Sequence, residues 1–292
     1  MGNTLETLRR VAELRERVAS WRGSNPDARI GLVPTMGCIH DGHLALIHAA
    51  RAACDHVVVS LFVNPTQFGP SEDFSGYPRD EAADAGLIGQ AGVDVLFMPS
   101  VAEMYGDGSE VGTTTVSVSR VSEGLCGDHR PGHFDGVATI VAKLFGQVRP
   151  DAAWFGEKDY QQLLVIRRMT EDLDLAVQVK SVPTIREPDG LAMSSRNAYL
   201  TDEERRLAPR LFAALTDAAQ AIADGGRADD CCRDAILALH KAGFSKIDYV
   251  EARDAATLES ITGTTTGPAR VLAAVRLSKA RLIDNLAVPQ HG

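Results

Sequence analysis

The nine residues HVVVSLFVN (56–64) decide the expected fold of this chain. They form an almost unbroken apolar run that is rich in β-branched side chains and shows no alternation of polar and apolar positions. Such a run is typical of a strand in a parallel sheet, where helices cover both faces and neither row of side chains meets water. The run ends at Asn64-Pro65, a dipeptide that favours a turn. We therefore expect a buried parallel strand at residues 57–63.

Strand and helix patterns alternate on both sides of this strand. Further strands are expected at 30–34, 93–98, 152–155 and 177–182, and helices at 43–54, 80–90, 134–147 and 160–172. This alternation predicts a Rossmann-like α/β fold with a doubly wound parallel sheet. The polar segments PTMG (34–37), NPTQFG (64–69) and FGEKDYQQ (155–162) directly follow strands. Because such sheets bind ligands beyond the carboxyl ends of their strands, we expect these segments to face one crevice.

The character of the sequence changes near Ile185. A polar loop, REPDGLAMSSRNAYL (186–200), precedes helical patterns at 201–223 and 229–242 and strand-like runs at 246–252, 270–275 and 281–288. This order predicts a smaller C-terminal α+β domain (185–292) after the domain that contains the parallel sheet (1–184), behind a loop that could close over the crevice. The segment GDGSEVGTTTVSVS (106–119) predicts a turn and a hairpin-like insertion.

The composition excludes several classes of function. The 292 residues are 45% hydrophobic and 24% charged, which is ordinary for a globular protein. The charged first 22 residues do not resemble a signal peptide, and no apolar run reaches the length of a membrane span, so we expect a cytoplasmic protein without a membrane partner. The net charge of −9 argues against nucleic-acid binding but leaves room for small anionic ligands in one cationic cleft.

The five cysteines are odd in number and lack C-x-x-C spacing, so we expect reduced thiols and no zinc site. No role is predicted for the adjacent pair Cys231-Cys232. Cys38 has no general base that can be identified from the sequence, and we expect no nucleophilic role for it. The common G-x-G-x-x-G and P-loop fingerprints are absent.

The segment VPTMGCIHDGH (33–43) carries two histidines, His40 and His43. A helix that starts near His40 would place both imidazoles on one face, beside unpaired backbone N–H groups and the positive end of the helix dipole. With Gly42 leaving this end open, the pair is a candidate phosphate cradle. A zinc site is less favoured, since H-x-x-H lacks the glutamate and third ligand of zinc motifs. The segment alone also allows two structural histidines.

Each of the other polar segments is ambiguous by itself. GEKDYQQ allows a surface Lys–Asp pair, MSSRN a serine-rich turn, NPTQFG an Asn-Pro turn and GDHRPGHF a simple loop. Together, however, the motifs PTMG-x-x-H-x-GH, FVNP-x-QF, YPR, RPGHF, FGEKD-x-QQ and GLAMSSRN follow one another through nearly the whole sequence. In this order they resemble the pantothenate synthetase (pantoate–β-alanine ligase) family of the HxGH nucleotidylyltransferases.

The resemblance implies an ATP-dependent ligase that condenses (R)-pantoate with β-alanine to pantothenate, AMP and pyrophosphate. The pantoate carboxylate would attack the α-phosphorus of ATP, and β-alanine would then displace AMP from a bound pantoyl adenylate. Mg²⁺ would arrive with ATP, without direct protein ligands and with Asp84 as a candidate outer contact. The resemblance also implies a homodimer and no organic cofactor. It implies that domain 1–184 binds ATP and pantoate and that domain 185–292 is a lid. Because a closed loop would protect the acyl adenylate from water, we expect segment 186–197 to be mobile in the absence of ligand.

The same resemblance implies a set of site residues. The catalytic candidates are His40, His43, Lys158 and Arg196, where the two cations would stabilise the phosphates. The implied ATP-binding residues are Met36, Gly37, His40, Gly42, His43, Gly156, Glu157, Lys158, Asp159, Ile185, Met193, Ser194, Ser195 and Arg196. The implied pantoate and β-alanine residues are Gln67, Gln162, Asn64, Tyr77, Arg130 and His133. His43 matches the usual proton donor, but adenylation has no obvious proton to deliver, so its protonation chemistry stays open.

Two alternatives remain at this stage. An adenylyltransferase that acts on a phosphate monoester would keep the fold, but we would expect extra cations where this chain has Gln67 and Gln162. A non-catalytic nucleotide- or metal-binding protein would bind its ligand without turnover.

Overall fold

The computed structural model describes residues 5–69, 74, 76, 77, 79–106 and 114–290. The chain forms two compact units, which are described separately below. Unit 1 contains Met1–Ser122, Arg130–Glu157 and Gln162–Pro183, and unit 2 contains Glu123–His129, Lys158–Gln161 and Thr184–Gly292. The roles predicted for domains 1–184 and 185–292 stay predictions at this point.

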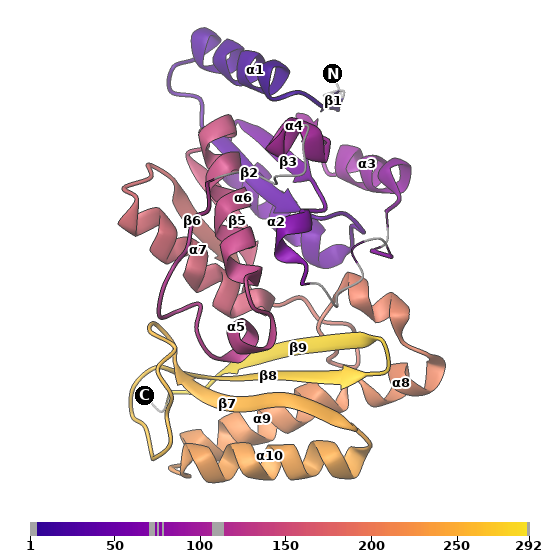
Figure 1. The fold of residues 1–292 in the computed structure, drawn as a ribbon, viewed down its shortest axis with the longest axis vertical. Helices are drawn as coiled ribbons and strands as arrows, with labels where there is room; N and C mark the ends of the chain where they lie inside the picture. Colours follow the sequence, from indigo (N-terminus) through magenta and orange to yellow (C-terminus); the bar gives the residue numbers. More distant parts are fainter. Residues whose placement is uncertain (1–4, 70–73, 75, 78, 107–113, 291–292) are drawn as a thin grey trace. The chain divides into compact units, whose positions relative to one another are not determined.

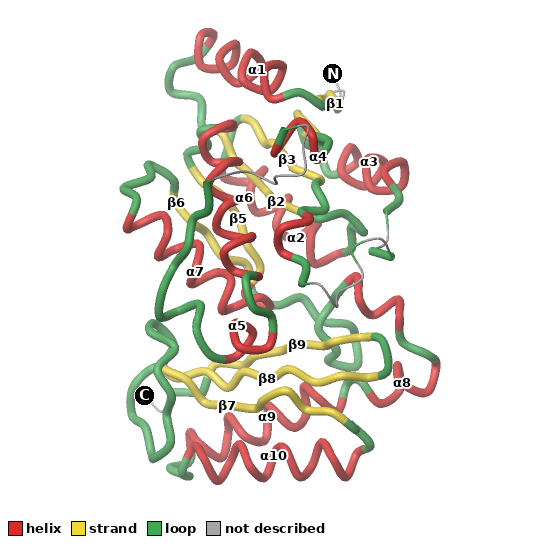
Figure 2. The backbone as a smooth tube through the Cα atoms, in the orientation of Figure 1, coloured by secondary structure: helices red, strands yellow, loops and turns green. Residues whose placement is uncertain are grey.

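Unit 1 is built on a six-stranded parallel sheet (Figure 2). Its strands are β1 (Glu6–Leu8), β2 (Ile30–Thr35), β3 (His56–Leu61), β4 (Val95–Phe97), β5 (Ala152–Gly156) and β6 (Gln178–Val182), in the order β1-β4-β3-β2-β5-β6. From β2 the chain proceeds through β3 to β4 on one side and then crosses to β5 on the other side of β2. The strand order thus reverses beside β2, which is where doubly wound sheets bind their ligands. The predicted Rossmann-like sheet is confirmed.

The helices of this part of the chain cover both faces of the sheet. They are α1 (Val11–Ser24), α2 (Asp41–Ala53), α3 (Glu81–Gln90), α4 (Val101–Tyr105), α6 (His133–Val148) and α7 (Tyr160–Asp172). Val57 and Val59 of β3 pack in one apolar cluster with Ile47 of α2 and Ile88 of α3. Helix α6 crosses the opposite face (Figure 1). Burial on both faces explains why the sequence of β3 is apolar throughout.

Unit 2 contains a three-stranded antiparallel sheet in the order β7-β8-β9. Its elements are β7 (Lys246–Asp254), β8 (Ala269–Leu277), β9 (Ala280–Ala287), α5 (Leu125–His129), α8 (Asp202–Leu207), α9 (Arg210–Ala223) and α10 (Ala228–Ala242). Helices α9 and α10 lie along one face of this sheet, and their apolar side chains share its core (Figure 1). The predicted smaller α+β part of the chain is therefore present.

Two expectations about secondary structure are not met. The helix expected over 201–223 is divided into α8 and α9, because Pro209 lacks a backbone N–H group and cannot donate the hydrogen bond that would continue α8. The expected hairpin at 106–119 lies partly outside the described residues, and the described part, 114–119, contains no strand. There the Val116 N–H donates to Thr139 Oγ1 of α6 at 2.9 Å instead of a neighbouring strand.

The sequence patterns do not predict strand β1 and helix α1. Helix α1 buries only Leu14 and Val18, so its apolar stripe is too sparse to stand out from the charged residues around it. No described helix has both the length and the hydropathy that a membrane span requires.

Candidate functional site

The turn that follows β2 is held by a buried carboxylate. Gly37 and Cys38 both have positive φ angles, of 89° and 53°. The carboxylate of Asp84, which is only 3% exposed, accepts the N–H groups of Cys38 at 2.9 Å and Ile39 at 2.8 Å. A Cβ at position 37 would lie 2.9 Å from Asp84 Oδ2, so this close approach requires glycine. Asp84 thus fixes the entry of the chain into α2.

Helix α2 begins with the two predicted histidines. His40 is the N-cap residue, and its Nδ1 accepts the Gly42 N–H at 3.1 Å, while His43 Nδ1 accepts the His40 N–H at 3.4 Å. The ring centroids are 4.0 Å apart. Because Nδ1 of each ring is an acceptor, the neutral form of each ring carries its proton on Nε2. The helix start near His40 is confirmed, and both imidazoles are arranged as Nε2–H donors.

The backbone at this helix start differs from the prediction. The Gly42 N–H is bonded to His40 Nδ1, and the His43 N–H donates to the His40 carbonyl at 2.8 Å. The expectation of unpaired backbone N–H groups is therefore wrong for these two residues. A phosphate bound here would therefore accept hydrogen bonds mainly from the two imidazoles and less from the backbone.

Cys38 lies within the same turn. Burial raises the pKa of the Cys38 thiol, and the nearby carboxylates of Asp84 and Asp80 raise it further. Each of these effects disfavours the thiolate, which is the nucleophilic form of cysteine. None of the five cysteines, all of which are described, forms a disulfide.

The NPTQ turn after β3 is organised by Asn64. Its Oδ1 accepts hydrogen bonds from Tyr105 Oη at 2.7 Å and Thr66 Oγ1 at 3.0 Å, and its Nδ2 donates to the carbonyl of Gly136 at 3.1 Å and to Gln67 Oε1 at 3.3 Å. The amide has two donor hydrogens and two acceptor lone pairs, so these four bonds use its full capacity. This geometry favours a role for Asn64 in holding the turn over a direct contact with substrate.

Gln67 belongs to the NPTQFG segment and contacts two other predicted segments, PTMG and RPGHF. Its Nε2 donates to Met36 Sδ, so the PTMG and NPTQ segments meet as expected. Its backbone carbonyl accepts from His133 Nδ1 at 2.8 Å and from Arg130 at 3.3 Å. His133 Nε2 lies 2.8 Å from the same guanidinium, which can only donate. Both contacts of His133 are satisfied by the neutral ring with its proton on Nδ1, the tautomer opposite to that of His40 and His43.

Tyr77 and Gln162 differ in their surroundings. Tyr77 is buried and packs edge to face on Phe68, with ring centroids 5.7 Å apart. The half-buried side chain of Gln162 makes no hydrogen bond to another described residue. Its neighbour Gln161 is buried, and its amide bonds the backbone of Glu123, Gly124 and Cys126. Gln161 therefore has a structural role, whereas the amide of Gln162 has no hydrogen-bond partner among the described residues.

The GEKD segment continues from β5. Gly156 pairs with Val182 of β6, and Glu157 Oε1 accepts from Ser181 Oγ at 3.0 Å. Lys158 and Asp159 belong to unit 2, where the Lys158 Nζ lies 3.6 Å from Asp159 Oδ1. The Lys158 side chain is only 17% exposed, so the alternative of a simple surface ion pair does not describe it.

The 185–197 loop of unit 2 is densely bonded. The Met193 N–H donates to the Ile185 carbonyl at 2.9 Å, and Ser194 Oγ accepts the Arg196 N–H at 3.3 Å, where a short 3-10 helix (Ser195–Tyr199) begins. Arg205 of α8 pairs with both Glu187 and Asp189. These bonds stabilise the described conformation of the loop, and the expected mobility of 186–197 stays a prediction.

Comparison with known proteins agrees with the motifs. The sequence profile of pantoate-beta-alanine ligase matches residues 6–287. A pantothenate synthetase from Rhodospirillum rubrum is 56% identical over 284 residues, which cover 97% of this chain and 99% of the relative. The pantothenate synthetase of Caulobacter vibrioides is 51% identical over 283 residues, covering 96% and 98% of the two chains. The chain belongs to the pantoate–β-alanine ligase family.

Solved structures extend the match to three dimensions. A crystal structure of pantothenate synthetase from Thermus thermophilus is 47% identical and superposes with a TM-score of 0.89, over 97% of this chain and 99% of that one. A pantoate–β-alanine ligase from Francisella tularensis, complexed with beta-gamma ATP and β-alanine, is 31% identical with a TM-score of 0.80, over 97% of both chains. The predicted family, fold class and ligase activity are confirmed.

A cavity in unit 1 brings residues of the predicted motifs together with others that the motifs did not indicate. It has a volume of about 220 Å³ and opens beside Met36 and Gly37. Arg79 and the carboxylates of Asp80 and Asp84 line it together with apolar side chains. The motifs also give no indication of Tyr105 and Thr66, although these residues fix Asn64. Tyr105 lies 41 residues from Asn64, so its spacing carries no local signal.

Proposed function

We propose that this chain joins (R)-pantoate to β-alanine in two steps at the expense of one ATP. In the first step the pantoate carboxylate attacks the α-phosphorus, and pyrophosphate leaves. In the second step the β-alanine amine attacks the acyl carbon of pantoyl adenylate, and AMP leaves with the former carboxylate oxygen. The observation that carries the proposal is the full-length family match, which accompanies the arrangement of both motif histidines as Nε2–H donors.

The family motifs assign ATP-binding roles to residues within each unit. In unit 1 these are the turn at Met36 and Gly37, the α2 start with His40, Gly42 and His43, and the β5 end with Gly156 and Glu157. In unit 2 they are Lys158, Asp159, Ile185 and the Met193–Arg196 segment. Lys158 and Arg196 offset the charge repulsion between a carboxylate and a polyphosphate and stabilise the departing pyrophosphate. Ser194 and Ser195 add hydroxyl donors to the phosphate oxygens.

His40 and His43 act in this proposal as hydrogen-bond donors. With Nδ1 bonded to backbone N–H groups, each neutral ring donates its Nε2–H to a phosphate oxygen and keeps its proton. No proton is consumed when a carboxylate displaces pyrophosphate, so the first step does not require His43 to be an acid.

Pantoate is assigned chiefly to Gln67 and Gln162. A primary amide suits this substrate because it donates to a carboxylate and accepts from a hydroxyl. Gln162 has no described side-chain partner, and Gln67 Nε2 contacts a weakly accepting thioether that a substrate oxygen could replace. Asn64, Arg130 and His133 support Gln67 through the bonds described above, and Tyr77 packs behind the turn.

Mg²⁺ enters with ATP in this proposal. Asp84 uses both carboxylate oxygens on backbone N–H groups, and among the described residues no three metal-ligating side chains gather in one place. The residues present therefore fit an ion held by the phosphates of ATP better than an ion held by the protein. The proposal includes a homodimer in the cytoplasm, with ATP, pantoate and β-alanine as partners and no nucleic acid or membrane.

An isotope experiment tests the proposed chemistry. With ¹⁸O in both carboxylate oxygens of pantoate, we expect one labelled oxygen in AMP and one in the amide of pantothenate. A parallel reaction without β-alanine should release pyrophosphate only up to the amount of enzyme. Unlabelled AMP would exclude the acyl adenylate, and a product that keeps the AMP moiety would favour the adenylyltransferase alternative.

A further inference from the structure

Strand β9 carries two adjacent buried polar residues, Asp284 and Asn285, each of which is 3% exposed. Burying a charge and an amide costs free energy unless both are fully bonded, and apolar side chains would fill the same space at lower cost. The partners of these two side chains therefore indicate what they do. Each of them has one partner, Lys158 or Arg186, in the GEKD segment or the 185–197 loop.

Asn285 holds the backbone of Lys158. Its Nδ2 donates to the Lys158 carbonyl at 2.9 Å, and its Oδ1 accepts from the guanidinium of Arg270. Arg270 lies 3.9 Å above the ring of Tyr160, two residues beyond Lys158. Because an arginine only donates and a carbonyl only accepts, these two partners fix the orientation of the amide. The GEKD segment is thus bonded at Lys158 and stacked at Tyr160.

Asp284 holds the other cationic segment. Its two oxygens accept from the two terminal nitrogens of Arg186 at 2.7 Å and 2.9 Å, a bidentate pair. The same guanidinium donates to the Gly190 carbonyl at 3.0 Å and lies 4.0 Å above the ring of Phe212. Gly190 has a φ of 93°, and a Cβ there would meet Phe212 at 2.5 Å. The loop that leads to Arg196 is therefore fixed at its turn.

We propose that Asp284 and Asn285 are positioning residues that set the spacing of Lys158 and Arg196 for the α- and β-phosphates of ATP. Successive side chains of a strand point to opposite faces, so one strand can hold two separate segments. A strand is also more rigid than either loop, and a rigid support is what a cation pair aimed at a transition state needs. This inference rests on the proposed function, because it assumes that the two cations bind one ATP.

The chain offers a matched control in the same sheet. Asp248 of β7 is a buried carboxylate that pairs with Arg281 at 2.7 Å and Arg276 at 3.3 Å. It has the same chemistry as Asp284, but the partners of its carboxylate lie outside both the GEKD segment and the 185–197 loop. Replacing Asp248 should lower the stability of the fold without changing kcat/KM for ATP.

The first measurement is the steady-state rate of pyrophosphate release from ATP, pantoate and β-alanine by the full chain. Asn285→Asp keeps the shape and the acceptor for Arg270 but removes the donor to Lys158. Asp284→Asn keeps the shape and weakens the pair with Arg186. We expect each to lower kcat/KM for ATP by ~10-fold or more, the scale of one lost buried hydrogen bond, and to leave KM for pantoate within ~2-fold. Asp248→Asn should leave both within ~2-fold.

A double-mutant cycle separates positioning from general damage. If Asn285 acts through Lys158, Asn285→Asp should have an effect of ~2-fold or less in a Lys158→Ala background. An undiminished effect there, or an equal loss of kcat/KM in Asp248→Asn, would overturn the inference. Where Asn285→Asp fails to fold, Arg270→Lys, which removes only the planar donor pair and the stacking on Tyr160, serves the same cycle. Failure of wild-type protein to form pantothenate would instead refute the proposed function.

Discussion

The α2 start of unit 1 and the 185–197 loop of unit 2 are both assigned to phosphate, but they are held in different ways. His40 and His43 are bonded to backbone N–H groups within three residues, and Asp84 binds the turn before them from farther along the chain. The loop is held by ion pairs, of which Arg186–Asp284 joins residues 98 apart. The first arrangement depends on hydrogen bonds to backbone N–H groups and the second on ion pairs between side chains, so the two should respond differently to substitution, salt and pH.

The largest expected effect is the loss of the Asp84 carboxylate, which accepts two backbone N–H groups in the turn before α2. Asp84→Ala leaves the Cys38 and Ile39 N–H groups buried without acceptors, each of which costs ~1–3 kcal/mol. We expect a loss of about 4 kcal/mol in the free energy of unfolding, measured by urea titration. Asp80→Ala removes a carboxylate from the cap of α3, four residues earlier, and should cost only ~1 kcal/mol. Similar losses in both variants would show that Asp84 does not clamp the turn.

The next prediction distinguishes two roles of His40, which is the N-cap of α2 and a proposed hydrogen-bond donor to phosphate. Asparagine is among the best N-cap residues, so His40→Asn should change the free energy of unfolding by less than ~0.5 kcal/mol. It removes the Nε2–H donor, and we expect the rate of pyrophosphate release to fall by ~10²-fold. His48→Asn, at an exposed position of the same helix, is the control and should have a normal rate. A normal rate in His40→Asn would mean that this histidine is only a cap.

The same contrast explains what could be predicted from the sequence. The run at 56–64 and the start of α2 are determined by their own side chains, so the parallel sheet and the helix start at the histidine pair follow from local patterns. The ion pairs of the 185–197 loop and the contact of Tyr105 with Asn64 join distant residues, and a single sequence contains no signal for such pairings. The sequence therefore gives no indication of the ion pairs that Arg205 and Asp284 make with this loop.

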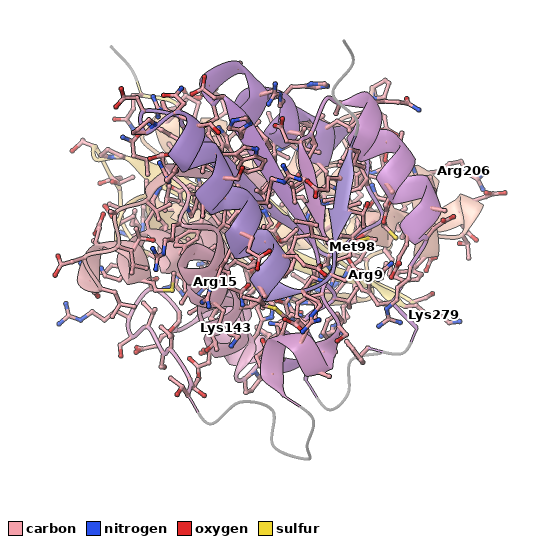
Figure 3. All side chains as sticks on the ribbon, turned by 90° about the horizontal axis from the view of Figure 1, so that it is seen from above. Arg9, Arg15, Met98, Lys143, Arg206 and Lys279 are labelled. Atoms are coloured by element: carbon pink, nitrogen blue, oxygen red, sulfur yellow. The ribbon has the colours of Figure 1, made fainter. Side chains whose placement is uncertain are left out.

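A smaller effect is expected when the two partly exposed ion pairs of Arg205 with the loop are removed. Arg205 pairs with Glu187 and Asp189, whereas its neighbour Arg206 projects into solvent (Figure 3). Partly exposed ion pairs contribute up to ~1 kcal/mol, so Arg205→Ala should accelerate hydrogen exchange of the Gly190 and Leu191 amides by ~5-fold. Arg206→Ala should not change it. In 1 M NaCl, screening should make the wild-type loop approach the Arg205→Ala variant, while amides at the start of α2 stay unchanged.

The smallest effect is an acid dependence that is confined to the loop. The hydrogen bond from Arg205 is the main cause that lowers the pKa of Asp189, although partial burial opposes it. A carboxylate whose pKa is lower in the folded protein stabilises it above the unfolded value of ~3.9, and this contribution is lost as the pH falls through the folded value. We therefore expect exchange of the Leu191 amide, corrected for its intrinsic pH dependence, to be constant from pH 7 to about pH 5 and to accelerate below about pH 4. Asp189→Asn keeps the acceptor for this amide but has no charge to lose, so its corrected exchange should depend less on pH. An equal acceleration in the variant would assign the acid response to Glu187, the other carboxylate that Arg205 contacts.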